Sequence, residues 1–337
     1  MVSPVSQPGA TSGDSGFIVS GGDLFRQAAL ACNAIDRNTT AMDPQLQADF
    51  MMTANMLIRA WRNAGMHLWK EREAVLFPAV GQVRYNLSLG SADHFAIQYF
   101  QGVSTATVAG GSVIPCLTSG VDANGVAGQM NAGDQIGILL DSGALYWSTV
   151  KSLTAAAVTI NGIVPGQAST GAAIFTYTAA SAAAAAAGFA RPMMLLNRRR
   201  RNVQSTIEVP IDHLARRDWD DIPYKAQVGG TIFRSYFDLQ REAAYLNVNQ
   251  PPSSITDIVA FVARLPIEDF VVATNNPDLP EEWYLALLWN MAKERMFGFN
   301  VPAQRRAEIK TNAEYWLANV MTEDREEESV FFAPNFN

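Results

Sequence analysis

Four consecutive arginines, Arg198 to Arg201 in "LLNRRRRNV", are the most concentrated positive charge of the sequence. Guanidinium groups bind phosphate and carboxylate oxygens, so the run could contact nucleic acid, act as a targeting signal or pair with acidic side chains. If the segment is a strand, Arg198 and Arg200 face one side of the sheet. Arg199 and Arg201 then face the other side, so the four cannot form a single basic face.

Two carboxylate pairs, at residues 220–221 and 281–282, could act as general acid and base. The second pair is better explained by a helix N-terminus, which favours negative charge. The first pair follows Arg216 and Arg217, and we expect local ion pairs there. The sequence lacks a phosphate-binding glycine loop, a nucleophile elbow and a histidine pair at metal spacing. We therefore expect no enzyme, no cofactor and no metal site.

The cysteines and histidines are few and scattered. They are Cys32, Cys116, His67, His94 and His213. Their spacing fits neither a disulfide framework nor the usual zinc patterns, so we expect packing roles for all five.

The bulk composition restricts the possible partners. The chain has 337 residues, a net charge of -7, 48% hydrophobic and 17% charged residues. This length suffices for two domains with proper cores. The acidic balance excludes a general DNA-coating protein, whose affinity comes from many Lys and Arg contacts to phosphate. The low charge indicates that some apolar surface lies against partners.

Three segments are expected to lie outside the folded core. Residues 1–22 lack the basic and apolar regions of a signal peptide and predict a flexible arm. The alanine-rich stretch 171–190 approaches the length of a bilayer span, but Gly, Ser and Thr interrupt it. We expect a spacer at 179–190 and no membrane insertion. Residues 323–337 predict an acidic, aromatic tail.

Helical periodicity is clearest near both ends of the chain. Apolar residues recur at helical spacing over 46–61, after Asp43 as the N-cap and Pro44 in the first turn. A shorter helix over 24–35 is predicted to begin after a stop at residues 21–23.

A second helical region follows Asp278, the predicted N-cap of a capping box with Glu281, and ends at Gly298. Its apolar residues point in nearly every direction, so we expect burial on several sides, completed by neighbouring subunits. A further helix over about 303–321 carries its apolar residues on one stripe.

Between these regions, β-branched and aromatic residues predominate. Residues 74–89 predict strand, turn, strand. The low-charge region 93–178 predicts a β domain, sandwich or barrel-like, with hairpins turned at 141–143 and 161–162. The fold class is therefore α+β: a helical and mixed core of residues 23–92 and 191–322, interrupted by the β domain.

Seven segments are specific in combination: "VGQVRYNL", "RPMMLLNRRRRN", "PIDHLARRDWDDIPYKAQVGGTIFRSYFD", "NVNQPP", "ARLPIEDF", "DLPEEWYLALLWNMAKERM" and "EDREEESVFFAP". Together they resemble the head-to-tail adaptor or tail-tube family of short-tailed bacteriophages, proteins that dock beneath the portal. The resemblance covers roughly three quarters of the chain and departs from the family in the low-charge insert and at "GGTIF".

The resemblance implies a structural protein of the virion neck or tail, made in the bacterial cytoplasm. It implies a homo-oligomeric ring, commonly of twelve subunits, that binds the portal protein and other tail or neck proteins. The ring would surround double-stranded DNA in a channel without reading its sequence. The residues expected at subunit or partner interfaces are Trp283, Tyr284, Leu288, Trp289, Glu326, Glu327, Glu328, Phe331 and Phe332.

Within such a ring, the run Arg198 to Arg201 has several possible partners. Pairing with acids such as those at 326–328, in the same or a neighbouring subunit, is the favoured interpretation. Partial contact with channel DNA, a portal contact and a solvated face stay open.

Tyr146 and Trp147 support an alternative function. Aromatic rings on a strand can stack on a sugar or a base. Adjacent strand residues point to opposite faces, which is more typical of one core and one surface position. The alternative is a tail or decoration protein whose β domain binds a host-surface glycan through these two residues.

Overall fold

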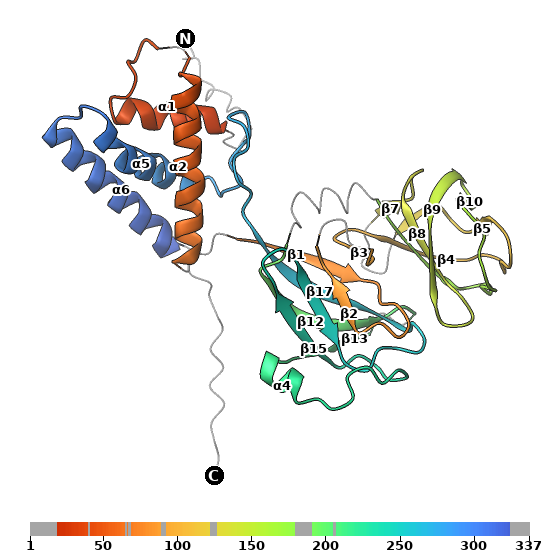
Figure 1. Cartoon of the computed structure of the whole chain (residues 1–337). Helices are drawn as coiled ribbons and strands as arrows, with labels where there is room; N and C mark the ends of the chain where they lie inside the picture. Colours follow the sequence, from red (N-terminus) through yellow and green to blue (C-terminus); the bar gives the residue numbers. More distant parts are fainter. Residues whose placement is uncertain are drawn as a thin grey trace, which may run out of the picture. The chain divides into compact units, whose positions relative to one another are not determined.

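The computed structural model describes residues 19–39, 41–64, 66, 69–88, 92–121, 127–178, 191–204 and 207–323 (Figure 1). Most of the predicted arm and tail, and the whole predicted spacer, lie outside these residues. The chain divides into two compact units, residues 1–68 with 267–337, and residues 69–266. The first contains helices and the second mainly strands, so the expected mixed α+β class is confirmed.

The helical unit, residues 1–68 with 267–337, begins and ends its longest helices where the periodicity predicts. The Asp43 carboxylate caps α2 and accepts hydrogen bonds from the N–H groups of Gln45 and Leu46, at 2.9 and 3.2 Å. Pro44 occupies the first turn. The elements are α1 (Gly21–Ala31), α2 (Pro44–Asn63), α5 (Trp283–Arg295), the 3-10 turn η1 (Met296–Gly298) and α6 (Ala303–Glu323).

The predicted stop at residues 21–23 is wrong, because α1 begins at Gly21. The N–H groups of residues 21 and 22 donate to backbone carbonyls at Asn275 and Ala273, at 2.8 and 2.7 Å. A Cβ on Gly21 would lie 2.9 Å from the Phe270 ring, so this close approach requires glycine. At its other end the helix stops before Asn33, which has a φ of 57°.

The predicted capping box at Asp278 is also wrong, because α5 begins at Trp283. Leu279 precedes Pro280, and a residue before proline is disfavoured in the helical conformation. The Trp283 N–H donates to the Pro280 carbonyl at 3.0 Å in a turn that leads into the helix. The Asp278 carboxylate instead accepts a hydrogen bond from the N–H of Glu268 at 3.1 Å.

Helix α5 packs against α1, α2 and α6 (Figure 1). Burial on several sides is therefore confirmed, but the chain's own helices provide it. Trp283 is only 3% exposed, and its ring centroid lies 5.6 Å from that of Trp61. The prediction that neighbouring subunits must bury this residue is wrong. Leu285 is the one exposed large apolar side chain of α5, at 42%.

The β unit, residues 69–266, forms three larger sheets and the ribbon β6–β7 among its described residues. The sheet orders are β13-β12-β17-β1-β3, β14-β15-β16-β2 and β4-β11-β8-β9-β10-β5. The strand–turn–strand predicted over 74–89 corresponds to β1 and β2, which belong to different sheets.

The elements of the β unit have the following bounds: β1 (Trp69–Leu76), β2 (Arg84–Asn86), β3 (Phe95–Ala96), β4 (Phe100–Val103), β5 (Val113–Pro115), β6 (Ser119–Val121), β7 (Ala127–Gln129), β8 (Gln135–Leu139), β9 (Leu145–Thr154), β10 (Ala157–Ile160), β11 (Ala173–Tyr177), β12 (Met194–Asn202), β13 (Glu208–Pro210), β14 (Asp212–His213), α4 (Arg216–Asp220), β15 (Arg234–Leu239), β16 (Ala244–Val248) and β17 (Asp257–Pro266).

The six-stranded sheet curls until its two edges meet. A β-bridge joins Ser104, after edge strand β4, to Cys116, after edge strand β5. The Thr105 N–H also donates to the Pro115 carbonyl at 2.8 Å. A separate apolar core fills this sheet, and its largest fully buried side chains include Ile114, Met130 and Ile136.

One of the two hairpins predicted in this sheet is confirmed. Strands β8 and β9 pair around a turn with Gly143 at a φ of 82°. The hairpin at residues 161–162 is wrong, because the next strand, β11, pairs with β4 and β8 and not with β10. Strand β10 already has β9 on one side and β5 on the other, so neither edge is open to a further strand.

A side chain at Gly143 is expected to destabilise the β unit. The φ of this glycine is in the left-handed region, and a Cβ there would lie 2.2 Å from Ser254 Oγ. We expect Gly143→Ala to lower the free energy of unfolding by about 2–4 kcal/mol, as a strained backbone and a clash add. Gly133→Ala is the matched control: its φ is 92°, but nothing lies within 4 Å of its added Cβ. Urea unfolding with equal losses for both variants would contradict the expected clash.

Candidate functional site

The arginine run lies on β12, between β17 and β13 in the five-stranded sheet. A register shift between Leu196 and Arg199 accompanies a positive φ of 45° at Asn197. Beyond this irregularity the arginines alternate between the two faces of the sheet, as the strand geometry predicts. Arg199 lies opposite Ala260, and Arg200 lies opposite Val259.

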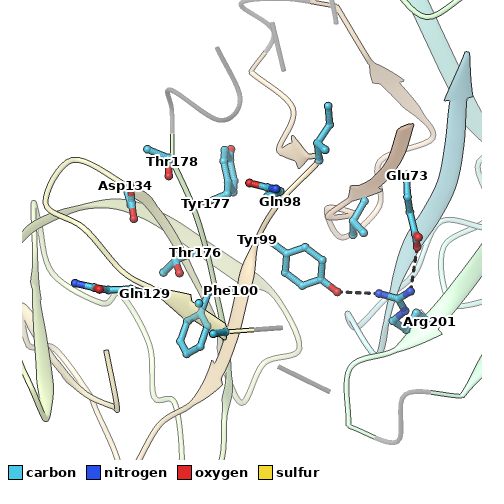
Figure 2. Close-up of a pocket in the computed structure, with 14 residues that line it drawn as sticks. Glu73, Gln98, Tyr99, Phe100, Gln129, Asp134, Thr176, Tyr177, Thr178 and Arg201 are labelled. Atoms are coloured by element: carbon cyan, nitrogen blue, oxygen red, sulfur yellow. Dashed lines mark hydrogen bonds and ion pairs between the residues drawn. The ribbon is translucent and has the colours of Figure 1, made fainter. Parts of the chain in front are cut away.

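Arg199 and Arg201 share two carboxylates from neighbouring strands. The Arg199 guanidinium contacts Glu73 on β1 and Glu208 on β13, both at 2.5 Å. The Arg201 guanidinium contacts the same two glutamates at 3.1 and 2.6 Å. It also donates to the Tyr99 hydroxyl at 3.1 Å (Figure 2). We call these four charged residues the arginine–glutamate cluster.

Arg198 and Arg200 face the other side of the sheet. Arg198 is 7% exposed and donates to the Ser235 hydroxyl at 2.9 Å. Burial lowers the pKa of its guanidinium to about 10, because the charged form is desolvated. The Arg200 guanidinium lies 3.6 Å from the Asp257 carboxylate.

All four arginines therefore have polar partners within the chain. The partners of Arg199 and Arg201 are Glu73 and Glu208, which the sequence interpretation did not single out. Glutamates 326–328, the acids suggested there, lie outside the described residues, as do Phe331 and Phe332. No sequence signal singled out Glu73, which is one of four consecutive charged residues at 70–73 and has a half-exposed side chain.

A pocket of about 440 Å³ lies next to this cluster, within the β unit. Glu73, Tyr99 and Arg201 line one part of it (Figure 2). Asp134 and Gln129 line another part. The other lining residues are Val75, Ile97, Gln98, Phe100, Ala127, Gly128, Thr176, Tyr177 and Thr178.

An aromatic cluster joins the six-stranded sheet to the five-stranded sheet. The ring of Trp147 stacks on His94, with centroids 4.0 Å apart and planes 11° apart. His94 Nδ1 and the Tyr177 hydroxyl form a hydrogen bond of 2.7 Å. Phe77 lies 5.1 Å from Phe175, centroid to centroid. Trp147 is therefore held in a packed cluster, and Tyr146 packs on the separate core of the six-stranded sheet.

His94 makes the stability of this cluster dependent on pH. Burial lowers its pKa from 6.5 to about 4, partly opposed by the Asp93 carboxylate. Above pH 6.5 the ring is neutral in both the folded and the unfolded chain. As the pH falls from 6.5 to about 4, the unfolded chain takes up the proton first, so the folded state loses stability.

We expect His94→Gln to remove this loss. Between about pH 7 and about pH 4.5 the wild type should lose about 1–2 kcal/mol more than the variant, after allowance for solvent screening. Urea unfolding at the two pH values measures the difference. Equal losses in the two proteins would show that His94 does not govern this dependence.

The other predicted residues lie in ordinary structural settings. Cys32 and Cys116 are buried free thiols. The Arg216 guanidinium lies 3.8 Å from the Asp220 carboxylate, one helical turn away. The His213 ring accepts a hydrogen bond from the Arg198 N–H at 3.2 Å. His67 lies outside the described residues.

The predicted interface residues on α5 are not equivalent. Trp283 lies in the core, whereas Tyr284, Leu288 and Trp289 are partly buried and pack against that core. Only these last three leave part of a side chain at the surface of the unit.

Neither a scan against models of known protein families nor a search of the curated proteins finds a match for this chain. In the part of the chain that the structure describes, no helix combines the length and apolarity needed to cross a bilayer. Those same residues contain no group of three or more His, Cys, Asp or Glu side chains placed to hold a metal ion.

Proposed function

We propose that the protein is a structural virion subunit that forms a ring below the portal of a short-tailed bacteriophage. In this role it continues the DNA channel as a head-to-tail adaptor or tail tube and carries later tail proteins. A helical and mixed core interrupted by a β domain, as the sequence pattern predicts, is part of the same proposal.

The observation that carries the proposal is an apolar pair on the outer face of α2. Met52 and Met56 are one helical turn apart and are 53% and 55% exposed. The opposite face of the helix, with Phe50, Ala54 and Ile58, is buried in the unit. Methionine side chains are flexible and apolar. Two of them on successive turns of an exposed helix face are typical of an adaptable protein–protein contact.

Other exposed apolar side chains of the helical unit extend the surface available for contact. The larger ones are Leu285, Phe297, Tyr315 and Met321. Isolated apolar residues are normal on a monomer, so the α2 pair carries the argument and these residues add to it.

The arginine–glutamate cluster also supports a channel role. DNA must slide through such a ring, so free guanidinium groups that bind phosphate would retard it. Glu73 and Glu208 offset the charges of Arg199 and Arg201. The chain as a whole carries a net charge of -7.

Oligomeric state tests the proposal. We expect native mass spectrometry of the full chain to show a closed oligomer, and Met52→Glu with Met56→Glu to reduce it to monomer without a loss of thermal stability. Ile163→Glu is the control, since Ile163 is an exposed apolar residue of the β unit. Assembly of the double variant at wild-type strength would refute the role given to α2.

A further inference from the structure

Asp134 is a buried carboxylate of which the fold uses only one oxygen. The residue is 2% exposed, and its Oδ2 accepts a hydrogen bond from the Asn131 N–H at 2.7 Å. This bond closes the turn that leads into β8. Oδ1 is buried and has no hydrogen-bond partner among the described residues. A buried charged acceptor without a donor costs free energy, so a donor from outside the chain would be favourable here.

Asp134 is one of the residues that line the pocket of about 440 Å³ described above. Asp134 and Thr176, each 2% exposed, form its buried polar part. The amides of Gln98 and Gln129 lie at its exposed rim. Carboxylates only accept hydrogen bonds, whereas hydroxyl and amide groups both donate and accept. The pocket therefore matches a ligand with several groups that can do both.

The charges of the pocket disfavour an anion. Glu73 and Asp134 both line it, and the Arg201 guanidinium is already paired with Glu73 and Glu208. The aromatic side chains of Tyr99 and Phe100 give the same pocket apolar surface (Figure 2). Apolar walls with a few placed polar groups are typical of small-molecule sites of this size.

We propose that this pocket binds a neutral sugar unit, with one sugar hydroxyl donating to Asp134 Oδ1. Other hydroxyls bond to Gln98, Gln129 and Thr176, and the apolar face of the sugar lies against the aromatic side chains. The site differs from the glycan contact expected at Tyr146 and Trp147, neither of which lines the pocket. It does not depend on ring formation.

Saturation-transfer NMR of the full chain with glucose, galactose, N-acetylglucosamine and rhamnose tests the proposal. We expect at least one sugar to bind at millimolar concentration, and Asp134→Asn to weaken it about tenfold or more. The Asn keeps the side-chain shape but turns a donor toward the donor of the sugar. Asp141→Asn is the control, since the Asp141 carboxylate bonds to Ser169 outside this pocket.

A second variant tests sugar binding in the same pocket without altering the turn at Asp134. Gln129 is exposed, so Gln129→Ala should leave the fold intact and weaken the same sugar several-fold. Binding of none of the four sugars to the wild type would overturn the proposal, as would unchanged affinity in both pocket variants. Either result leaves the oligomeric state, and so the proposed ring, unaffected.

Discussion

Trp283→Ala is expected to lower the free energy of unfolding of the helical unit by about 3–5 kcal/mol. The indole ring is 3% exposed and packs against Trp61 at the point where α5 meets α2. Its removal loses the transfer free energy of a large aromatic side chain and leaves a cavity among helices that cannot all move inward. Thermal or urea unfolding, followed by circular dichroism at a helix-sensitive wavelength, measures the loss.

Leu285→Ala is the matched control on the same helix. Because Leu285 is 42% exposed, we expect a loss below about 1 kcal/mol. If Trp283→Ala cost no more than this control, the tryptophan would not be a core residue. Its assignment to a subunit interface would then have to be restored.

Removal of the two carboxylates of the arginine–glutamate cluster is expected to strengthen DNA binding. Glu73→Gln combined with Glu208→Gln leaves Arg199 and Arg201 without the carboxylates that offset them. We expect the double variant to bind short double-stranded DNA about tenfold or more tighter than the wild type at low salt. Its log–log salt dependence should steepen by roughly 0.9 for each released arginine that contacts phosphate. Fluorescence anisotropy of labelled DNA over a salt series provides both numbers.

A control must separate this effect from the change in net charge. Glu294 and Glu314 are exposed glutamates of the helical unit, and the described residues include no ion pair to either. Glu294→Gln with Glu314→Gln removes the same two charges. Equal DNA binding by the two double variants would attribute the effect to net charge and remove the cluster from the account.

The sequence predicted the helices best where local signals agree. At α2, the N-cap Asp43, Pro44 and the apolar period all indicate the same start, and the structure begins there. At α5, the signals conflict. Asp278 and Glu281 have capping-box spacing, but Pro280 between them prevents a helix from starting at Leu279. The steric effect of the proline outweighs the spacing of the carboxylates.

Contacts between residues far apart in the chain could not be predicted from the sequence. Strand alternation predicted that Arg198 and Arg199 face opposite sides, but it could not show which acids meet them. Glu73 is remote from Arg199 in the sequence and reaches it only because β17 lies between β1 and β12. Asp134 was missed for a similar reason, since an aspartate next to glycine in a turn gives no sign that one oxygen lacks a partner.

The burial of α5 illustrates the same limit. A helix that is apolar on all sides has to be covered, and the sequence shows this need correctly. It does not show whether α1, α2 and α6 of the same chain or another molecule provides the cover. Met52 and Met56, exposed on α2, are therefore the residues that we expect to mediate assembly.

Negative-stain electron microscopy of the purified full chain at high concentration tests the central claim most directly. We expect ring-shaped particles with a central opening wide enough for double-stranded DNA, and their loss in the variant Met52→Glu with Met56→Glu. A uniform population of single subunits in the wild type, with no rings in any class of particles, would contradict it.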